Sequence, residues 1–249
     1  MIGNSDTNAT YIFRNKATFF EPRIRIRAFE SEVKLVDITD DGNWILAVEL
    51  NGLIHLINYH RENNTVVLFK LPFNLGNQTE AGAISDDSKW LFFGDHSGRL
   101  YVTILTQLNS DTASLILAQI LEGDGPIHHI SLTADKQFLA YSTIGKKVYV
   151  YKKEDQYVAL QTIEYENEAE RKVVLTNDHQ FMSVSGGSDK KAYFYKYEAQ
   201  SGKFEEYLEK KFDEDVEHVV VSEDKNWVVV SEKYHAHILS GLVDGELQN

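Results

Sequence analysis

Two histidines near the end of the chain have the spacing that most directly suggests chemistry. His235 and His237 lie in a β-rich run, where alternation along a strand would place both imidazoles on one face. Imidazole is a common ligand of zinc and copper. A catalytic or structural zinc site requires at least three protein ligands, and sequence spacing identifies no third one. We therefore predict no metal and no cofactor, and interpret the pair as surface or cross-strand hydrogen-bonding residues.

Other sequences that resemble functional motifs fail for definable reasons. His128 and His129 are adjacent, so in a regular strand they face opposite ways and do not chelate together. The run from Asp37 to Gly42 begins like a calcium loop, but its twelfth position is Val48, where a bidentate Glu is required. The chain also has no nucleophile elbow, no phosphate-binding glycine loop and no zinc-protease helix motif. We predict no catalytic residue and no enzymatic activity.

A basic concentration lies close to the N-terminus. Arg23, Arg25 and Arg27 would share one face of a strand, with isoleucines on the other face. These side chains could bind a phosphate, an acidic peptide or an RNA backbone. They could also form a solvated outer strand that pairs with the acidic stretch 213–215, and we favour this second interpretation because exposed charge pairs are common and weak.

Composition excludes several classes of function. The 249 residues carry a formal net charge of −13, which disfavours nonspecific nucleic-acid binding. Without cysteine the chain has no disulfide, zinc-thiolate site or cysteine nucleophile. No apolar run approaches the roughly 20 residues that cross a bilayer, and the polar N-terminus lacks a signal-peptide pattern. We predict a cytoplasmic protein without membrane insertion, with cytoskeletal or ciliary association as an alternative.

The elements that would position any site are indicated by a short phrase that occurs five times. It reads Ser or Thr, one residue, Asp, two residues, then a large aromatic residue, and the aromatic residues are 46, 48, 43 and 46 positions apart. Such a period indicates a repeat architecture. We expect each Asp to accept hydrogen bonds from turn amides, and each aromatic side chain to wedge between neighbouring sheets. These structural anchors are Asp41, Trp44, Asp87, Trp90, Asp135, Phe138, Asp178, Phe181, Asp224 and Trp227.

Each repeat reads as four short antiparallel strands. In the first repeat, the turn at 40–43 and the tight-hairpin signal Asn51-Gly52 separate β-rich runs, and no stretch has the 3.6-residue period of a helix. In the third repeat we expect separate strands at 138–142 and 148–151. The sequence therefore predicts an all-β propeller of four-stranded antiparallel blades, in which the last repeat lacks its fourth strand. The five repeats cover about 33–73, 79–122, 125–165, 170–212 and 216–240.

The order, period and phrase resemble the WD40-type β-propeller. The nearest matches to its hairpin line are 94–102 and 185–195. The usual Gly-His is absent, and Tyr-Lys at 151–152 and 195–196 replaces the usual Trp-Asp. Only Asp189 matches the hairpin Asp of the buried tetrad of that family. The resemblance implies a degenerate propeller that binds partners and does not catalyse a reaction.

Ring closure has two readings. We divide the chain into an N-terminal extension, 1–22, with a strand near 11–13, and a propeller, 23–249. In the favoured reading the strand at 23–29 completes repeat five and closes the ring. In the alternative the repeats form an open segment of a larger propeller, whose exposed edge would accept a partner strand.

The predicted function is that of a non-catalytic interaction scaffold whose partners are other protein subunits. One alternative is a metal-dependent, lactonase-like propeller hydrolase that recruits His235, His237 and Asp95. A second is a nucleic-acid-associated subunit that uses the N-terminal arginines, although the net charge makes nucleic acid an unfavoured partner. The candidate partner contacts are Arg23, Arg25, Arg27, His96, Lys190 and Tyr234.

Overall fold

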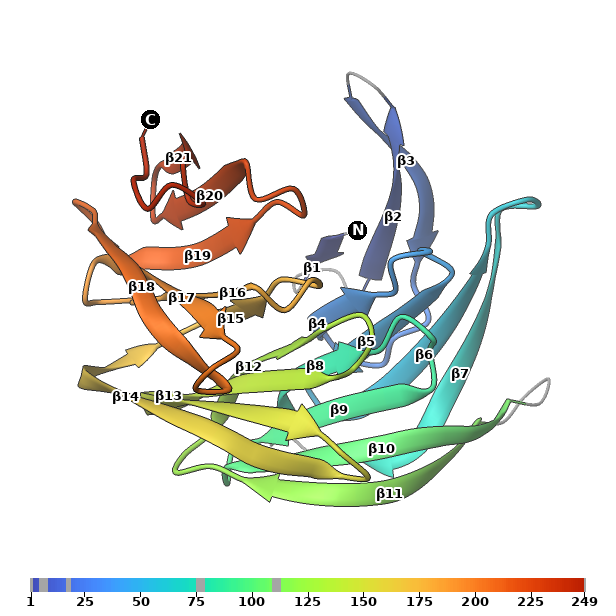
Figure 1. Cartoon of the computed structure of the whole chain (residues 1–249). Coiled ribbons are helices and arrows are strands. Elements are labelled where there is room, and N and C mark those ends of the chain that lie inside the picture. Colours follow the sequence, from blue (N-terminus) through green and yellow to red (C-terminus); the bar gives the residue numbers. More distant parts are fainter. Residues whose placement is uncertain (1, 5–8, 17–18, 75–78, 109–112, 249) are drawn as a thin grey trace. The chain divides into compact units, whose positions relative to one another are not determined.

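The computed structural model describes residues 2–4, 9–16, 19–74, 79–108 and 113–248. All regular elements among these residues are β-strands (Figure 1). None of the described residues forms a helix long and apolar enough to cross a bilayer. The chain divides into two compact units. Unit 1 comprises residues 1–96 and 100–121, and unit 2 comprises residues 97–99 and 122–249.

Unit 1 contains three antiparallel sheets whose strands are hydrogen-bonded in chain order. The first is small and the other two have four strands each, as predicted for repeats one and two. The sheets consist of β1 (Ile2–Asn4), β2 (Ala9–Lys16) and β3 (Phe19–Ile26); β4 (Val33–Ile38), β5 (Trp44–Glu49), β6 (Leu53–His60) and β7 (Thr65–Asn74); and β8 (Thr79–Ile84), β9 (Trp90–Asp95), β10 (Arg99–Leu108) and β11 (Ala113–Glu122).

Unit 2 contains the sheets of repeats three, four and five, again in chain order. They consist of β12 (Ile127–Leu132), β13 (Phe138–Lys153) and β14 (Tyr157–Glu170); β15 (Val173–Leu175), β16 (Phe181–Ser185), β17 (Lys191–Glu198) and β18 (Lys203–Lys211); and β19 (Val216–Val221), β20 (Trp227–Glu232) and β21 (Ala236–Ser240).

Repeats three and five differ in detail from the prediction. The two strands expected at 138–142 and 148–151 form the single long element β13, whose ends lie together because Lys153 N donates to Gln137 O at 2.8 Å. β13 therefore folds back as a hairpin and supplies the two middle strands of its blade. In repeat five, a single bridge between Ser240 and Gln248 takes the place of the fourth strand.

The predicted closing strand belongs to a different sheet. Residues 23–26 lie in β3, which pairs antiparallel with β2 in a register that joins Ile12 to Ile24. The strand expected near 11–13 is part of β2. The segment thus forms a sheet with β1 and β2, and not the fourth strand of repeat five as the closure hypothesis expected.

Consecutive sheets share their cores within each unit. In unit 1, Leu46 and Val48 of β5 join Leu91 and Phe93 of β9 in one buried cluster. In unit 2, Phe138 belongs to a buried cluster with Met182 and other residues of repeat four. One sheet cannot bury both of its faces alone, and repeated face-to-face packing of small sheets is the solution that propellers use. The predicted all-β propeller of antiparallel blades is confirmed.

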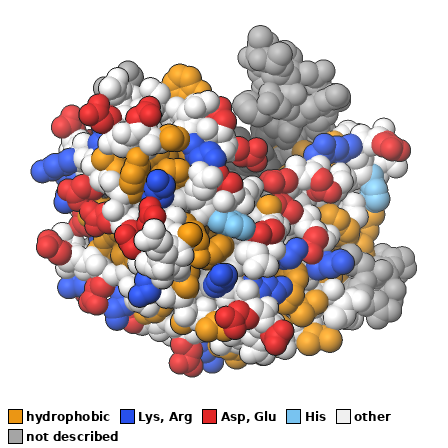
Figure 2. Space-filling model, in the orientation of Figure 1, with side chains coloured by type: hydrophobic (Ala, Val, Ile, Leu, Met, Phe, Trp, Pro, Cys, Tyr) orange, Lys and Arg blue, Asp and Glu red, His pale blue; other side chains and the backbone are white. Residues whose placement is uncertain are grey.

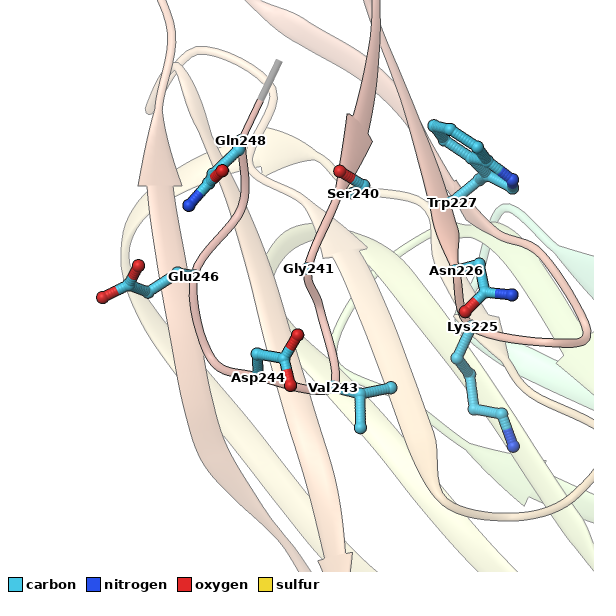
Figure 3. Close-up of a pocket in the computed structure, with 9 residues that line it drawn as sticks. All are labelled: Lys225, Asn226, Trp227, Ser240, Gly241, Val243, Asp244, Glu246 and Gln248. Carbon is cyan, nitrogen blue, oxygen red and sulfur yellow. The ribbon is translucent and has the colours of Figure 1, made fainter.

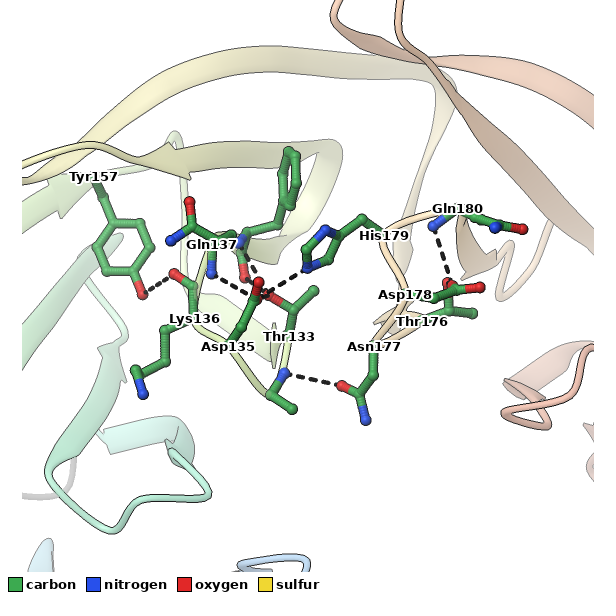
Figure 4. A network of polar contacts seen from close by, with 12 residues as sticks. Thr133, Asp135, Lys136, Gln137, Tyr157, Thr176, Asn177, Asp178, His179 and Gln180 are labelled. Atoms are coloured by element: carbon green, nitrogen blue, oxygen red, sulfur yellow. Dashed lines mark hydrogen bonds and ion pairs between the residues drawn. The ribbon is translucent and has the colours of Figure 1, made fainter.

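The recurrent phrase forms the predicted turn in all five repeats. In repeat three, Thr133 Oγ1 donates to Asp135 Oδ1 at 2.8 Å, and the same oxygen accepts from Gln137 N at 3.0 Å. The residue after each Asp has a left-handed backbone, with φ of 64° at Lys136. Figure 4 shows that His179 of the next turn reaches back to Asp135, with 3.0 Å between Nε2 and Oδ1. The turns thus also connect neighbouring blades.

The aromatic anchors differ in burial, contrary to the uniform wedging that the repeat predicts. Phe138 and Phe181 are 3% and 2% exposed, and Phe138 contacts the rings of Tyr197 and Phe204 of the following blade. Trp227 is 54% exposed. The physical reason is that residues of the next blade cover each buried anchor, and within unit 2 no blade follows repeat five.

Candidate functional site

An irregularity of the first strand recurs in four of the five blades. The register of β4, β8, β12 and β19 with the second strand skips one residue near the start of the first strand. A β-bulge of this kind leaves one residue unpaired and changes the direction of its side chain, and bulges are enriched next to active sites. The skipped residues are Lys34, Glu80, His128 and Glu217.

In unit 2 these bulges bring titratable side chains to one pocket. A cavity of about 470 Å³ is lined by His128 of β12, Lys172 immediately before β15 and Glu217 of β19. Glu170 and Asp215 add two further carboxylates, and Gly187 and Ser188 complete the lining together with Ala169 and Val216. Because the bulge allows both Glu217 and His218 to be exposed beside buried Val216, one strand contributes two polar groups.

Gly187 is required at its position in the pocket wall. Its backbone is left-handed, with φ of 52°, and it forms an isolated bridge with Val216. A Cβ atom there would lie 3.1 Å from both Ala169 Cβ and Glu170 O. A side chain at this position would therefore strain the backbone and crowd the segment that carries Glu170.

A lysine and a histidine are directly coupled at this site. Lys172 Nζ lies 2.7 Å from His218 Nε2. Burial lowers the pKa of the Lys172 ammonium, and the carboxylates of Glu217 and Glu170 oppose that shift. Burial and then the Lys172 charge lower the pKa of His218. An unprotonated imidazole nitrogen that accepts a hydrogen bond from an ammonium is consistent with both shifts.

A second histidine lies behind this couple. Burial, followed by the positive charge of Lys172, lowers the pKa of His129 to about 3. Its Nδ1 atom is buried and has no hydrogen-bond partner among the described residues. His129 is thus a neutral ring near neutral pH, and it does not repel the Lys172 ammonium.

Together these groups can carry out general acid–base chemistry. An imidazole that is unprotonated near neutral pH can accept a proton from water. An ammonium beside it can stabilise a developing oxyanion. The pocket volume falls within the range of small-molecule sites, and its three carboxylates can accept hydrogen bonds from hydroxyl groups.

Two acid–histidine pairs outside this pocket have a structural role within their own blades. Glu49 Oε1 lies 2.5 Å from His55 Nε2, both side chains are buried, and Glu49 also accepts from the backbone amide of Ser31. Glu232 repeats this arrangement with His237 at 2.8 Å and the amide of Glu214 at 2.9 Å. Each Glu thus ties the segment before the first strand to the third strand of its blade.

The residues proposed for a metal-dependent hydrolase are not gathered into a metal site. Asp95 Oδ2 accepts from Tyr101 at 3.1 Å, and His237 bonds to Glu232. In the part of the chain that the structure describes, no group of three or more His, Cys, Asp or Glu side chains could hold a metal ion. Asp189, assigned to a buried tetrad by resemblance, instead binds Arg171 at 2.5 Å and Tyr193 at 3.2 Å.

The predicted partner contacts are dispersed. Arg25 lies over the Tyr11 ring at 5.2 Å, and Arg27 is exposed beyond the end of β3. His96 Nδ1 lies 3.6 Å from Glu80, and Lys190 donates to the backbone oxygen of Asp213. Tyr234 is exposed, and the side chain of Arg23 lies outside the described residues. Figure 2 shows acidic and basic side chains interspersed over the face in view. The role of these residues in binding stays a prediction.

A second pocket lies beside the exposed anchor of repeat five. It has a volume of about 580 Å³ and is lined by Trp227, Ser240 and the C-terminal segment that includes Asp244 and Gln248 (Figure 3). Trp227 pairs with Ser240 across β20 and β21. The pocket has no histidine, and its one lysine, Lys225, is engaged by Asp178. The pocket therefore offers the carboxylates of Asp244 and Glu246, but no imidazole and no ammonium that is not already engaged.

Sequence reasoning missed Lys172, Glu217 and His218 as site residues. A usable signal was present, because Lys34, Glu80, His128, Arg171 and Glu217 are all charged or histidine and all precede their anchor by ten positions. What the sequence does not show is the bulge. Under regular alternation His128 and His129 simply face opposite ways, and nothing brings Lys172 next to His218.

Comparison with known proteins shows similarity in structure but not in sequence. No protein-family model and no curated protein sequence matches this chain. A solved structure of a candidate 6-phosphogluconolactonase from Bacteroides uniformis matches with a TM-score of 0.75 and 14% identity, over 98% of this chain and 78% of the other. The periplasmic gluconolactonase of Pseudomonas aeruginosa matches with a TM-score of 0.74 and 13% identity, over 96% and 77%. A functionally unknown protein from Desulfotomaculum acetoxidans matches with a TM-score of 0.77 and 13% identity, over 99% and 80%.

These similarities correct three predictions. The named neighbours are lactonases and not WD40 proteins, so the propeller is confirmed but the WD40 assignment is not supported. The predictions of a non-catalytic scaffold and of no enzymatic activity are contradicted, because these neighbours are named as enzymes. At identities this low the likeness shows the fold alone, and the alternative of a lactonase-like hydrolase is the one that it favours.

Proposed function

We propose that this chain hydrolyses carbohydrate lactones at the pocket formed by β12, β19 and the residues that precede β15. The observation that carries the proposal is the contact of Lys172, which lines a cavity of about 470 Å³, with His218 beside that cavity, with 2.7 Å between Nζ and Nε2. The names of structurally similar lactonases support this class of reaction. The lowered pKa values of both groups support their use as acid–base residues.

Each group has a defined role in the proposed reaction. In the resting site the Lys172 ammonium donates to His218 Nε2. When a lactone binds, its carbonyl oxygen would accept the hydrogen bond from Lys172 in place of His218. The carbonyl group is then polarised, and His218 Nε2 is free to act as a base beside it. Water then adds to the carbonyl carbon and gives a proton to His218, and the oxyanion faces Lys172.

Collapse of this tetrahedral adduct completes the reaction. The bond between the carbonyl carbon and the ring oxygen breaks, and the imidazolium returns its proton to the leaving oxygen. The product is the open-chain hydroxy acid, and its carboxyl group ionises in solvent. Water is the only co-reactant, so the two residues are regenerated after each cycle.

Ring opening of glucono-1,5-lactone tests the proposal. Proton release would be followed with a pH indicator in slightly acidic buffer, and uncatalysed opening would be subtracted. Lys172→Met removes the oxyanion stabiliser and should lower kcat/KM by about 100-fold or more. His218→Gln removes the base and should lower it by a similar factor.

Matched controls separate the site from the surface. His235→Gln and Lys203→Met alter an exposed histidine and an exposed lysine outside the pocket, and neither should change the rate. The proposal is wrong if the wild-type chain does not accelerate ring opening. It is also wrong if the two site variants retain full activity.

A further inference from the structure

The charges of the pocket allow a narrower statement about its substrate, which rests on the proposed function. Glu170, Asp215 and Glu217 place three carboxylates in the lining, against a single ammonium on Lys172. We infer that the site takes an uncharged, polyhydroxylated lactone and discriminates against its phosphate ester.

The positions of the carboxylates follow from the backbone. Asp215 and Glu217 flank buried Val216 and both line the cavity, Asp215 from the position before β19 and Glu217 from the bulge of that strand. The Gly187–Val216 bridge fixes this strand against the loop that follows β16. Glu170 ends β14, and its neighbour Ala169 pairs with Gly145 of β13. The three acidic side chains are thus held at the end of β14 and at the start of β19, where the backbone is hydrogen-bonded to neighbouring segments.

Hydrogen-bond chemistry gives the first reason for discrimination. An ionised carboxylate only accepts hydrogen bonds, so it pairs with the hydroxyl groups of a sugar lactone. A phosphate is also acceptor-only near its fully ionised form. Placed among Glu170, Asp215 and Glu217 it would find few donors, and the Lys172 ammonium is already required at the carbonyl oxygen.

The nearby arginine does not compensate for these charges. Arg171 precedes Lys172, but its guanidinium is buried and binds Asp189 Oδ2 and the backbone oxygen of Gly145. It also lies over the Tyr165 ring at 4.3 Å. Because these contacts hold the buried guanidinium, Arg171 does not offer it to a phosphate group in the pocket.

Coulomb repulsion gives the second reason. Three carboxylates and one ammonium leave an excess of two negative charges around the cavity when the imidazole of His128, which also lines it, is neutral. For a phosphate dianion about 7 Å away in a water-like dielectric, the repulsion disfavours binding by roughly tenfold to fiftyfold before screening. We therefore expect at least about a tenfold preference for the unphosphorylated lactone at low salt, and a smaller one at high salt.

The test compares glucono-1,5-lactone with its 6-phosphate. The expected result is a kcat/KM at least about ten times higher for the unphosphorylated lactone. The triple variant Glu170→Gln, Asp215→Asn, Glu217→Gln keeps the size of the side chains and removes their charge, and it should erase most of this preference. Glu205→Gln changes an exposed carboxylate outside the pocket and should leave the preference intact.

A binding measurement distinguishes failure of this inference from failure of the proposed function. Calorimetry with the hydrolysis-inert gluconolactam and its 6-phosphate reports the charge preference even if no lactone is hydrolysed. Tighter binding of the uncharged lactam, reversed by the triple variant, supports the inference. A preference for either phosphate ester, a ratio that the triple variant does not change, or no binding of either lactam overturns it.

Discussion

Asp37 provides the sharpest test of how one carboxyl group affects the stability of this fold. Its two oxygens accept hydrogen bonds from Ile38 N and from Ile84 N of the next blade, each at 2.9 Å. Burial raises the pKa of Asp37 to about 6, and these amides oppose the shift without cancelling it. In the unfolded chain the same group titrates near its ordinary value of about 3.9.

The sign of the effect follows from proton binding. Between about pH 4 and pH 6 the folded state holds a proton that the unfolded state has lost, so the free energy of unfolding decreases as the pH rises. A shift of about two pKa units corresponds to at most about 3 kcal/mol, fully present below pH 4 and lost as the pH passes 6. Since Asp37 is only partly buried by surface area, about 2 kcal/mol is a realistic expectation.

The substitution that isolates this effect is provided by the protein itself. Ser131 occupies the equivalent position in repeat three, where its hydroxyl accepts from Leu175 N at 2.9 Å. Asp37→Ser therefore keeps an acceptor and removes the charge. Urea unfolding of both proteins would be measured from pH 4 to pH 7. The stability of the variant relative to the wild type should increase by about 2 kcal/mol across this range.

The comparison of two curves removes the contribution of other titrating groups, because these are common to both proteins. Asp155→Asn, at an exposed position in the hairpin between β13 and β14, serves as control and should give a curve parallel to that of the wild type. Parallel curves for Asp37→Ser would show that this carboxyl group titrates normally in the folded state. The assigned role of burial at Asp37 would then be incorrect.

The remaining predictions concern other repeats and the site. Phe181→Ala should destabilise the fold by about 3–5 kcal/mol, whereas Trp227→Ala should cost less than about 1 kcal/mol, as chemical unfolding would show. Acrylamide should quench a large part of the native tryptophan fluorescence in the wild type and less in Trp227→Phe. Asp135→Ala removes acceptors from the turn of repeat three and should cost about 1–3 kcal/mol, with faster amide exchange at Gln137. If His218 is the base, lactone hydrolysis should decline only below the ordinary imidazole pKa, since the lowered pKa keeps the ring unprotonated there; a decline that begins above that value would contradict this role.

The sequence predicts the repeat unit well because local chemistry specifies it. The Ser/Thr and Asp side chains bond to amides within five residues, so the turn is determined before any blade meets another. Packing between blades is a different matter. Phe181 and Trp227 occupy equivalent places in the phrase, yet one is covered by repeat five and the other is exposed, and only the number of blades decides which.

The candidate site could not be predicted in the same way because it depends on small deviations from regular structure. Glu217 and His218 are adjacent, and alternation would separate them until the bulge in β19 exposes both. Lys172 lies 46 positions away from His218 and meets it only because two first strands run side by side. The scaffold function was inferred from resemblance to WD40 propellers, and a shared fold does not fix the chemistry at its loops.

The left-handed residue of each turn has a consequence for how such an array can grow. His179 and Lys225 hold this position and bind the Asp of the preceding turn, whereas Gly42 holds it in repeat one and has no side chain to extend. A duplicated copy of repeat four therefore carries both partners of this contact. Its His179 binds the Asp of the preceding turn, and its Asp178 accepts from the residue at the same position in the following turn. Copies of repeats four and five can be inserted by recombination with this junction already formed, while a copy of repeat one would interrupt it.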